Sequence, residues 1–339
     1  MNATPAVTIL MPVRNAMATL DCCLDSIQAQ SLGDFELLVV DDASTDDSRE
    51  LVLARAQSDA RIRLLGASQR GLVACLNAGL GEARAPLIAR MDGDDLMDVE
   101  RLALQREYLQ RHPEVDVVAS RVRAFPVDRV QAGMKEYLRW QNACIGGDAL
   151  RDEVYVECPI THPSAMFRRA TVLGAGGYRD GDFPEDYELW LRLTEQGCRL
   201  AKIERCLLDW RQRDDSLSRR DPRYSRDAFD RLRARYLARD SRLNSGRALV
   251  FWGAGRRTRR RTRHLIALGF APCAWIDVDP KKIGNRIHDT PVMAPEWLRG
   301  RRPRPFVLSW VASHGAREKI AADLASMGYG RGADYLAVG

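Results

Sequence analysis

The chain lacks three features that mark membrane-spanning, secreted or zinc-binding proteins. No stretch of its 339 residues approaches the ~20 uninterrupted apolar residues that a spanning helix needs. The first residues contain no basic segment, and their apolar run is cut at Pro12, so we expect a first β-strand there and not a signal peptide. Eight cysteines are scattered without CxxC pairs or zinc spacing, which favours reduced thiols in a core. We therefore expect a cytoplasmic protein, either soluble or peripheral on the inner face of a membrane.

The composition is that of an ordinary soluble globular protein. Hydrophobic residues make up 45% of the chain and charged residues 29%, and the length is sufficient for two domains. The 52 lysines and arginines exceed the 46 aspartates and glutamates, which gives a formal net charge of +6. A positive charge favours phosphates, acidic polymers or an anionic membrane surface as partners, without choosing among them.

Strand and helix patterns alternate through the first part of the chain. Leu20, Leu24 and Ile27 fall at helical spacing, and short apolar runs indicate strands. The predicted strands are 7–13, 35–40, 61–65, 87–91 and 115–120, and the predicted helices are 16–30, 48–58, 72–83 and 99–111. This alternation predicts a mainly parallel sheet with right-handed crossovers. The pattern is poor from 121 to 157, so we expect a functional loop or a few short helices there, where an acceptor could be selected.

Two groups of aspartates follow predicted strands. Asp92-Gly93-Asp94-Asp95 comes after the apolar run 86–90 and Met91, and Asp41-Asp42-Ala43-Ser44 comes directly after the strand 35–40. Hard divalent cations take oxygen ligands, often one or two carboxylates together with substrate phosphates. Aspartate is also a common turn and cap residue, so each group has a purely structural alternative. Because ligands of open α/β sheets bind at the carboxyl ends of parallel strands, we expect both groups to line one cleft. A nucleotide-sugar site would put a base and ribose beside one group and a metal-bound diphosphate beside the other.

A third acidic group opens a predicted helix at 185–195. This helix follows a short predicted strand at 164–167 and precedes an extended segment at 199–207. Glu185 and Asp186 lie in its first turn, where the helix dipole stabilises negative charge. Helix capping accounts for one carboxylate, whereas a carboxylate that faces a sugar can act as general base for an acceptor hydroxyl.

The pattern restarts after 244–246 and predicts a second, smaller α/β unit. Its predicted elements are a strand at 247–252, a turn at 253–255, a helix at 256–268, strands at 272–276 and 306–310, and a helix at 313–327. The turn carries two glycines of a dinucleotide-binding fingerprint, but the third position is Thr258. We expect a Rossmann-like fold without redox use of NAD. The six arginines between Arg256 and Arg263 suit an anionic sugar or a nucleotide phosphate, or form a solvated face.

A strongly basic helix is predicted between 219 and 242. Phe229, Leu232 and Tyr236 form its apolar stripe. A solvated linker helix is the simpler interpretation, and contact with a membrane surface or an acidic polymer is the alternative.

Over about residues 7–218 the chain resembles the family 2 glycosyltransferases, which have a GT-A fold. Several short motifs carry the resemblance through their order and spacing. They are Pro12-Val13-Arg14-Asn15, Val39 to Asp46, Arg70-Gly71-Leu72, Asp92 to Asp95, Thr161-His162-Pro163-Ser164, Glu185 to Arg192, and Trp210-Arg211 with Ser216 to Ser218. The segment from Ile276 to Val292 is similar to the Rossmann-type domains attached to some sugar-modifying enzymes.

The resemblance implies a fold and a set of site residues. The implied fold is α/β, a GT-A nucleotide-diphospho-sugar transferase fold followed by a smaller Rossmann-like α/β domain. Donor-binding residues are Pro12, Arg14, Asn15, Asp42, Ser44, Arg70 and Asp92. Asp94, with Asp92 in the ribose or metal shell, binds Mn²⁺ or Mg²⁺. Asp186 deprotonates the acceptor hydroxyl with inversion at the anomeric carbon, and Glu185 contacts or orients the acceptor.

One position departs from the family pattern. Relatives often carry a histidine near the metal or diphosphate where this chain has Arg213. Arginine does not usefully ligate a metal but pairs with phosphate oxygens, so we expect Arg211 or Arg213 to close over the diphosphate. His162 and Trp190 are predicted on the acceptor side, with a purely structural histidine as the alternative.

The sequence thus predicts an inverting, metal-dependent glycosyltransferase that moves a sugar from a nucleotide-diphosphate donor to a surface glycan or lipid-linked saccharide. The predicted domains are 1–218 (GT-A), 219–245 (basic helical linker, a candidate membrane contact) and 246–339 (Rossmann-like), and no nucleic-acid partner is expected. A nucleotidyltransferase is disfavoured because it needs a glycine-rich loop where 12–15 lies. The hypothesis of an oxidoreductase depends on the turn at 253–255 alone. An inactive glycan-binding or scaffold protein is the remaining alternative.

Overall fold

The computed structural model describes residues 4–66, 70–311 and 315–339, which form two compact units. The first unit comprises Met1–Leu150, Pro159–Gly181 and Glu185–Arg220. The second comprises Arg151–Cys158, Asp182–Pro184 and Asp221–Gly339. No helix in the described ranges is both long and apolar enough to cross a membrane.

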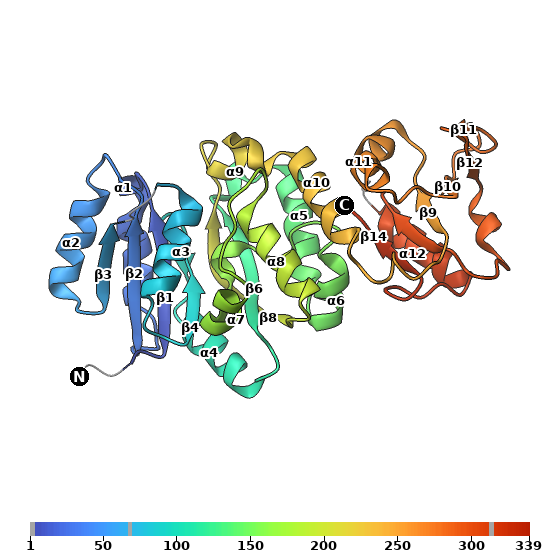
Figure 1. The fold of residues 1–339 in the computed structure, drawn as a ribbon. Coiled ribbons are helices and arrows are strands. Elements are labelled where there is room, and N and C mark those ends of the chain that lie inside the picture. The colour runs from blue at the N-terminus through green and yellow to red at the C-terminus, as the bar shows by residue number, and fades with distance from the viewer. Residues whose placement is uncertain (1–3, 67–69, 312–314) are drawn as a thin grey trace. The chain divides into compact units, whose positions relative to one another are not determined.

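The first unit is built on an eight-stranded sheet with the order β3-β2-β1-β4-β7-β6-β8-β5 (Figure 1). Its strands are β1 (Val7–Val13), β2 (Phe35–Asp41), β3 (Ile62–Gly66), β4 (Leu87–Arg90), β5 (Leu96–Met97), β6 (Val117–Phe125), β7 (Met166–Arg168) and β8 (Leu200–Arg211). The first four strands pair in parallel, as do β6 and β8. β7 is antiparallel to β4 and β6, and β5 is antiparallel to β8. The predicted α/β class with a mainly parallel sheet is confirmed.

Nine helices lie in the described residues up to Arg220, and some of them cover each face of this sheet. They are α1 (Met17–Gln28), α2 (Ser48–Ser58), α3 (Leu72–Glu82), α4 (Arg101–Arg111), α5 (Ala132–Ala143), α6 (Gly147–Glu153), α7 (Arg169–Gly174), α8 (Glu185–Glu195) and α9 (Leu217–Arg220), with 3₁₀ turns at Val127–Arg129 and His162–Ser164. Helices α1, α2 and α4 pack on one face of β1 and β2. On the other face, α3 comes so close that a Cβ on Gly79 would lie 2.1 Å from Leu10 Cδ1. All seven residues of β2 are buried, as expected for a parallel strand covered on both faces.

One segment differs from the sequence prediction, and a second agrees with it. The 3₁₀ turn His162–Ser164 occupies the start of the expected strand at 164–167, and β7 follows it. The poorly patterned stretch after 121 continues β6 to Phe125 and then forms α5 and α6, in agreement with the expectation of short helices.

The second unit has a six-stranded sheet with the order β11-β12-β10-β9-β13-β14. Its strands are β9 (Leu249–Trp252), β10 (Ala274–Ile276), β11 (Arg286–Ile287), β12 (Thr290–Met293), β13 (Phe306–Ser309) and β14 (Tyr335–Ala337), and its helices are α10 (Arg226–Leu237), α11 (Arg256–Ala267) and α12 (Ala316–Ser326), with 3₁₀ turns at Pro222–Tyr224 and Pro295–Leu298. All its strand pairs except β11–β12 are parallel. The predicted helix start at Ser313 lies outside the described residues.

The basic helix α10 is only partly solvated. Asp230 is buried, and its carboxylate lies 2.6 Å from Arg233 Nη1 and 2.9 Å from Arg261 Nη2 of α11. Leu232 and Tyr236 of the predicted apolar stripe are buried as well. The helix therefore packs against α11 within the second unit, because its apolar stripe and one aspartate face inward. The predicted domain boundaries at 218 and 245 stay a prediction.

Candidate active site

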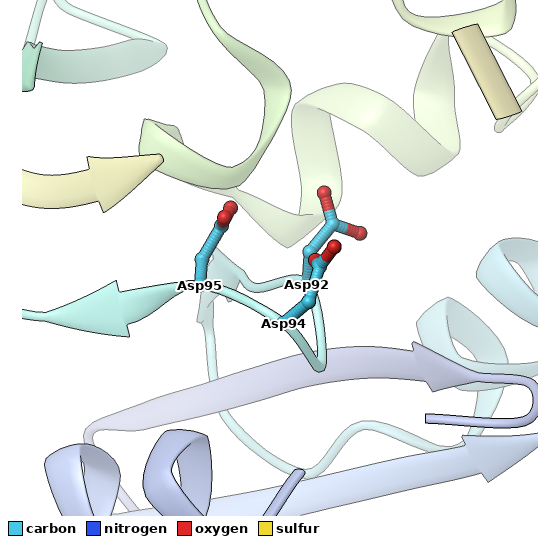
Figure 2. Close-up of side chains that lie close together, drawn as sticks. All are labelled: Asp92, Asp94 and Asp95. Atoms are coloured by element: carbon cyan, nitrogen blue, oxygen red, sulfur yellow. The ribbon is translucent and has the colours of Figure 1, made fainter. Parts of the chain in front are cut away.

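Three aspartates meet in the loop between β4 and β5. One carboxylate oxygen from each of Asp92, Asp94 and Asp95 lies within 4.8 Å of the others. Figure 2 shows the three side chains projecting from this loop toward the same side. The loop is a tight turn in which Asp95 N donates to the Asp92 carbonyl at 3.3 Å. A short strand on either side thus fixes three negative charges in a small volume.

The carboxylates of this cluster have too few hydrogen-bond donors and cations around them to balance their negative charge. Burial and the Asp92 carboxylate raise the pKa of Asp94 to about 6, and the same two causes raise the pKa of Asp95 well above its ordinary value. Asp95 Oδ2 is buried and has no hydrogen-bond partner among the described residues. Buried polar atoms without partners are rare, and three converging carboxylates are a typical donor set for Mg²⁺ or Mn²⁺. The residues present therefore fit a divalent cation.

Arg90 supplies a buried cation beside the cluster. It is the last residue of β4, is 3% exposed and forms an ion pair with Asp92. Arg101 of α4 donates to the Arg90 carbonyl at 2.9 Å and to the Ala165 carbonyl at 3.3 Å, which holds the end of β4 in place. Arg90 therefore fixes the orientation of Asp92.

The end of β8 is bonded to the acidic loop by Arg211. Its backbone N–H donates to Asp95 Oδ1 at 2.7 Å, and its Nε donates to the Asp94 carbonyl at 2.6 Å. The guanidinium lies over the Phe125 ring, with Cζ 4.4 Å from the centroid. Arg213 lies two residues further on, with Nη1 3.8 Å from Asp94 Oδ2. The structure thus brings both predicted arginines to Asp94.

Four of the predicted donor-binding residues meet after β1 and β2. Arg14 Nη1 is 3.6 Å from Asp42 Oδ2, and Gly71 N donates to Asp42 Oδ1 at 2.8 Å. Asn15 N donates to Ser44 Oγ at 3.1 Å, and Asn15 itself has a left-handed backbone with φ of 50°.

Two other predicted donor-binding residues lie beside this group. Pro12 pairs in register with Val40 next to it, and Arg70 is exposed immediately before Gly71.

Asp186 and Glu185 open α8. Burial and the Glu185 carboxylate raise the pKa of Asp186 to about 7, although Tyr187 N donates to Asp186 Oδ1 at 2.7 Å. Glu185 is more deeply buried, with 3% exposure.

The start of α8 is held by a buried ion pair. Arg192 Nη2 lies 2.8 Å from Glu188 Oε2 and 2.7 Å from the Gly177 carbonyl. The acidic first turn of α8 is therefore anchored to the preceding loop.

His162 and Trp190 pack under this acidic turn. His162 Nε2 is hydrogen-bonded to the Tyr178 hydroxyl at 2.8 Å, and its ring lies 6.0 Å from Trp190, edge to face. Burial, with the Arg90 cation as a second cause, lowers the pKa of His162 well below its ordinary value, so it is neutral. Trp190 is 0% exposed and His162 5%. Neither side chain offers an open surface to an acceptor, and their predicted acceptor-side role stays a prediction.

Comparison with known proteins assigns the family. The sequence profile described as "Glycosyl transferase family 2" matches residues 8–174. The chain is also 32% identical over 233 residues to EpsE of Bacillus subtilis (strain 168), an alignment that covers 67% of this chain and 80% of EpsE. The chain belongs to glycosyl transferase family 2. The resemblance inferred from the motifs is thereby confirmed.

Two further similarities are informative for this family 2 glycosyltransferase. It is 24% identical over 220 residues to the UDP-Gal:alpha-D-GlcNAc-diphosphoundecaprenol beta-1,3-galactosyltransferase of Escherichia coli, covering 64% of this chain and 78% of that enzyme. Its fold matches the mannosyltransferase PcManGT from Pyrobaculum calidifontis, solved in complex with GDP-Man and Mn²⁺, with a TM-score of 0.50 and 19% identity, covering 79% of this chain and 70% of that one. At that identity the structural match shows the fold alone.

Sequence reasoning did not assign a role to Arg90, Asp95 or Tyr178 in this family 2 site. A signal for Arg90 was present, because an arginine in the apolar run 86–90 needs an acidic partner. Asp95 belongs to the motif Asp92 to Asp95, but the resemblance implies metal binding for Asp92 and Asp94 alone. No sequence pattern links Tyr178 to His162, because their contact depends on the path of the loop before α8.

Proposed function

We propose that the first unit is an inverting, metal-dependent glycosyltransferase that moves a sugar from a nucleotide-diphosphate donor to a hydroxyl of a surface glycan or lipid-linked saccharide. The observation that carries this proposal is the cluster of Asp92, Asp94 and Asp95 with its unbalanced negative charge, on the same chain as a carboxylate of raised pKa at Asp186. The family membership supports glycosyl transfer. The use of a metal, the inversion of configuration and the class of acceptor are proposed here in addition to family membership.

In this account the donor binds at the carboxyl edge of β1, β2 and β4. Arg14 and Asp42, with the backbone around Pro12, bind the base; Asn15, Ser44 and Arg70 support the ribose side. Asn15 and Ser44 are already hydrogen-bonded to each other, so this surface is preorganised before donor binding. Arg211 and Arg213 reach the diphosphate from the end of β8, where guanidinium groups match phosphate oxygens.

Asp94 and Asp92, with Asp95 beside them, would hold Mn²⁺ or Mg²⁺. When bound, the cation supplies Lewis-acid stabilisation of the negative charge that develops on the departing nucleoside diphosphate. Arg90 keeps Asp92 oriented toward the cluster, so that the carboxylates need not reorganise during the reaction.

Asp186 is the proposed general base. Its carboxylate takes the proton of the acceptor hydroxyl while that oxygen bonds to the anomeric carbon, and the bond from that carbon to the diphosphate oxygen breaks on the opposite face. One displacement of this kind inverts the configuration. A pKa of about 7 suits a base that works near neutral pH. Glu185, which is buried, is proposed to orient the acceptor.

The second unit could contact an anionic membrane surface through exposed positive charge, which lies on α11 as well as on α10. Arg256, Arg257, Arg259 and Arg260 are exposed, and none forms an ion pair within the described ranges. On α10, by contrast, Asp227 is paired with Arg263 and His264 of α11. Co-sedimentation with vesicles that contain phosphatidylglycerol tests this contact. Weaker binding of the Arg256→Gln/Arg257→Gln protein than of the wild type is expected. Equal binding of the two proteins, or equal binding to neutral vesicles, would exclude a contact through α11.

The experiment that tests the function is a donor panel. Purified protein is incubated with nucleotide-diphosphate sugars and Mn²⁺ or Mg²⁺, and the release of nucleoside diphosphate is measured. Slow metal-dependent release from one donor, lost in Asp94→Ala and in Asp186→Asn, is the expected result. Absence of release and of metal-dependent donor binding would leave a glycan-binding or scaffold role.

A further inference from the structure

Arg213 already makes a polar contact with the carboxylate cluster. Its Nε and Nη2 donate to Asp215 Oδ1 and Oδ2 at 2.9 and 2.7 Å, a two-point contact that fixes the plane of the guanidinium. This leaves Nη1 directed toward Asp94, 3.8 Å from Oδ2. Arg213 is therefore held beside the same carboxylate that the proposed metal needs.

Arg211 is held differently, because its side chain contacts the backbone of the acidic loop and not the Asp94 carboxylate. Its Nε donates to the Asp94 carbonyl oxygen and its guanidinium lies on the Phe125 ring, so that among the described residues it forms no ion pair with Asp94. Within the described ranges, Arg90 is the other cation paired in the cluster, and it pairs with Asp92. Arg213 is thus the cation that faces Asp94.

We propose that Arg213 is an internal counter-cation of the cluster: it competes with a free divalent cation for Asp94, and it exchanges Asp94 for the donor's diphosphate when metal and donor bind together. The inference rests on the proposed donor site and specifies the order in which that site fills. Metal and nucleotide bind as a pair, because each alone meets an unfavourable charge: the metal meets Arg213, and the diphosphate meets three carboxylates.

The sign of each effect follows from Coulomb's law. A divalent cation at the cluster is repelled by the nearby guanidinium, which weakens binding of the metal alone by about tenfold at the high effective dielectric of a partly exposed site. The same guanidinium attracts a diphosphate, so it strengthens binding of the nucleotide. Arginine keeps its charge throughout the accessible pH range, so the exchange needs no proton transfer.

Titration calorimetry with two probes tests this exchange. Mn²⁺ alone, and then UDP or GDP in the presence of Mn²⁺, are titrated into the wild type, Arg213→Ala and Arg219→Ala. Arg219 is a matched control, because it pairs with Asp214 at 2.6 Å in the same segment and is 29% exposed against 31% for Arg213. Thermal unfolding establishes that each variant is folded.

The expected result is a pair of opposite changes. Arg213→Ala binds Mn²⁺ alone about tenfold more tightly and the nucleoside diphosphate with Mn²⁺ about tenfold more weakly, whereas Arg219→Ala stays close to the wild type. Equal Mn²⁺ affinity in wild type and Arg213→Ala, weaker Mn²⁺ binding in Arg213→Ala, or no Mn²⁺ binding to Arg213→Ala would each overturn the inference. If Mn²⁺ binding changes as expected but no nucleotide binds to any variant, the competition stands, and the exchange fails together with the proposed donor site.

Discussion

Both α/β units place an aspartate within two residues of the end of a buried strand, but the two positions differ in how well the carboxylate is paired. In the second unit, Asp277 follows β10 and accepts hydrogen bonds from Ala254 N at 2.9 Å and Asp279 N at 3.0 Å, and Lys282 Nζ lies 3.2 Å away. Burial alone raises the pKa of Asp277, but these donors together lower it below its ordinary value.

In the first unit the situation is reversed. The carboxylates after β4 are close to one another, and one oxygen of Asp95 has no partner within the described ranges. The same place in the topology therefore serves two purposes. A carboxylate whose oxygens all accept hydrogen bonds from the protein has a structural role. A buried carboxylate with too few donors needs a bound ligand to supply the missing interactions. The number of partners, and not the position at the sheet edge, distinguishes the candidate active site.

The largest effect is expected from removing the base. Asp186→Asn should lower kcat by about 10³-fold, since general-base catalysis contributes roughly 10²–10⁴. The free energy of unfolding at pH 8 should not fall, because the folded-state pKa of about 7 lies above the unfolded value, so that the ionised form destabilises the fold above neutral pH. Initial rates and urea denaturation measure the two quantities.

Glu185→Gln is the matched control for this substitution. It should reduce kcat less than Asp186→Asn does. A larger loss of kcat in Glu185→Gln than in Asp186→Asn would indicate that Glu185 is the base and that Asp186 orients the acceptor.

A smaller effect is expected from pH alone. Because the base must be ionised, kcat should be constant above pH 7 and fall about tenfold per pH unit below it. A profile from pH 5.5 to 9 with a saturating donor and metal measures this. A kcat that stays flat down to pH 5.5 would show that no group with a raised pKa acts as the base.

The smallest effect on activity is expected in the second unit. Asp277→Asn should lower the free energy of unfolding by about 1–3 kcal/mol, because it weakens a set of buried hydrogen bonds, and should leave transfer rates within about twofold of the wild type. Denaturation followed by tryptophan fluorescence and the donor assay measure the two effects. A large loss of activity in a folded Asp277→Asn protein would contradict the purely structural role assigned to Asp277.

The elements of the first unit could largely be predicted from the sequence, because their signals are local. In α1, for example, Leu20, Leu24 and Ile27 face the core at the spacing that predicted the helix. The acidic loop is predictable because a short, mostly apolar strand ends two residues before Asp92. Periodicity within ten residues is sufficient for such features.

The features that escaped prediction depend on distant contacts. The position of β7 between β4 and β6 is set by antiparallel pairing with strands far apart in the sequence, which no local pattern encodes. The burial of Trp190 and the packing of α10 on α11 have the same cause. The pairing of Arg213 with Asp94 likewise joins two loops separated by more than half of the first unit's sequence.

Calorimetry of UDP and GDP binding, with Mn²⁺ and with EDTA, to the wild type, Asp94→Asn and Asp277→Asn tests the proposed metal-dependent donor site. We expect Mn²⁺-dependent binding of one nucleotide to the wild type and to Asp277→Asn, abolished by EDTA and weakened at least about tenfold in Asp94→Asn. Binding that is insensitive to EDTA and to Asp94→Asn, or that is lost in a folded Asp277→Asn protein, would contradict this expectation.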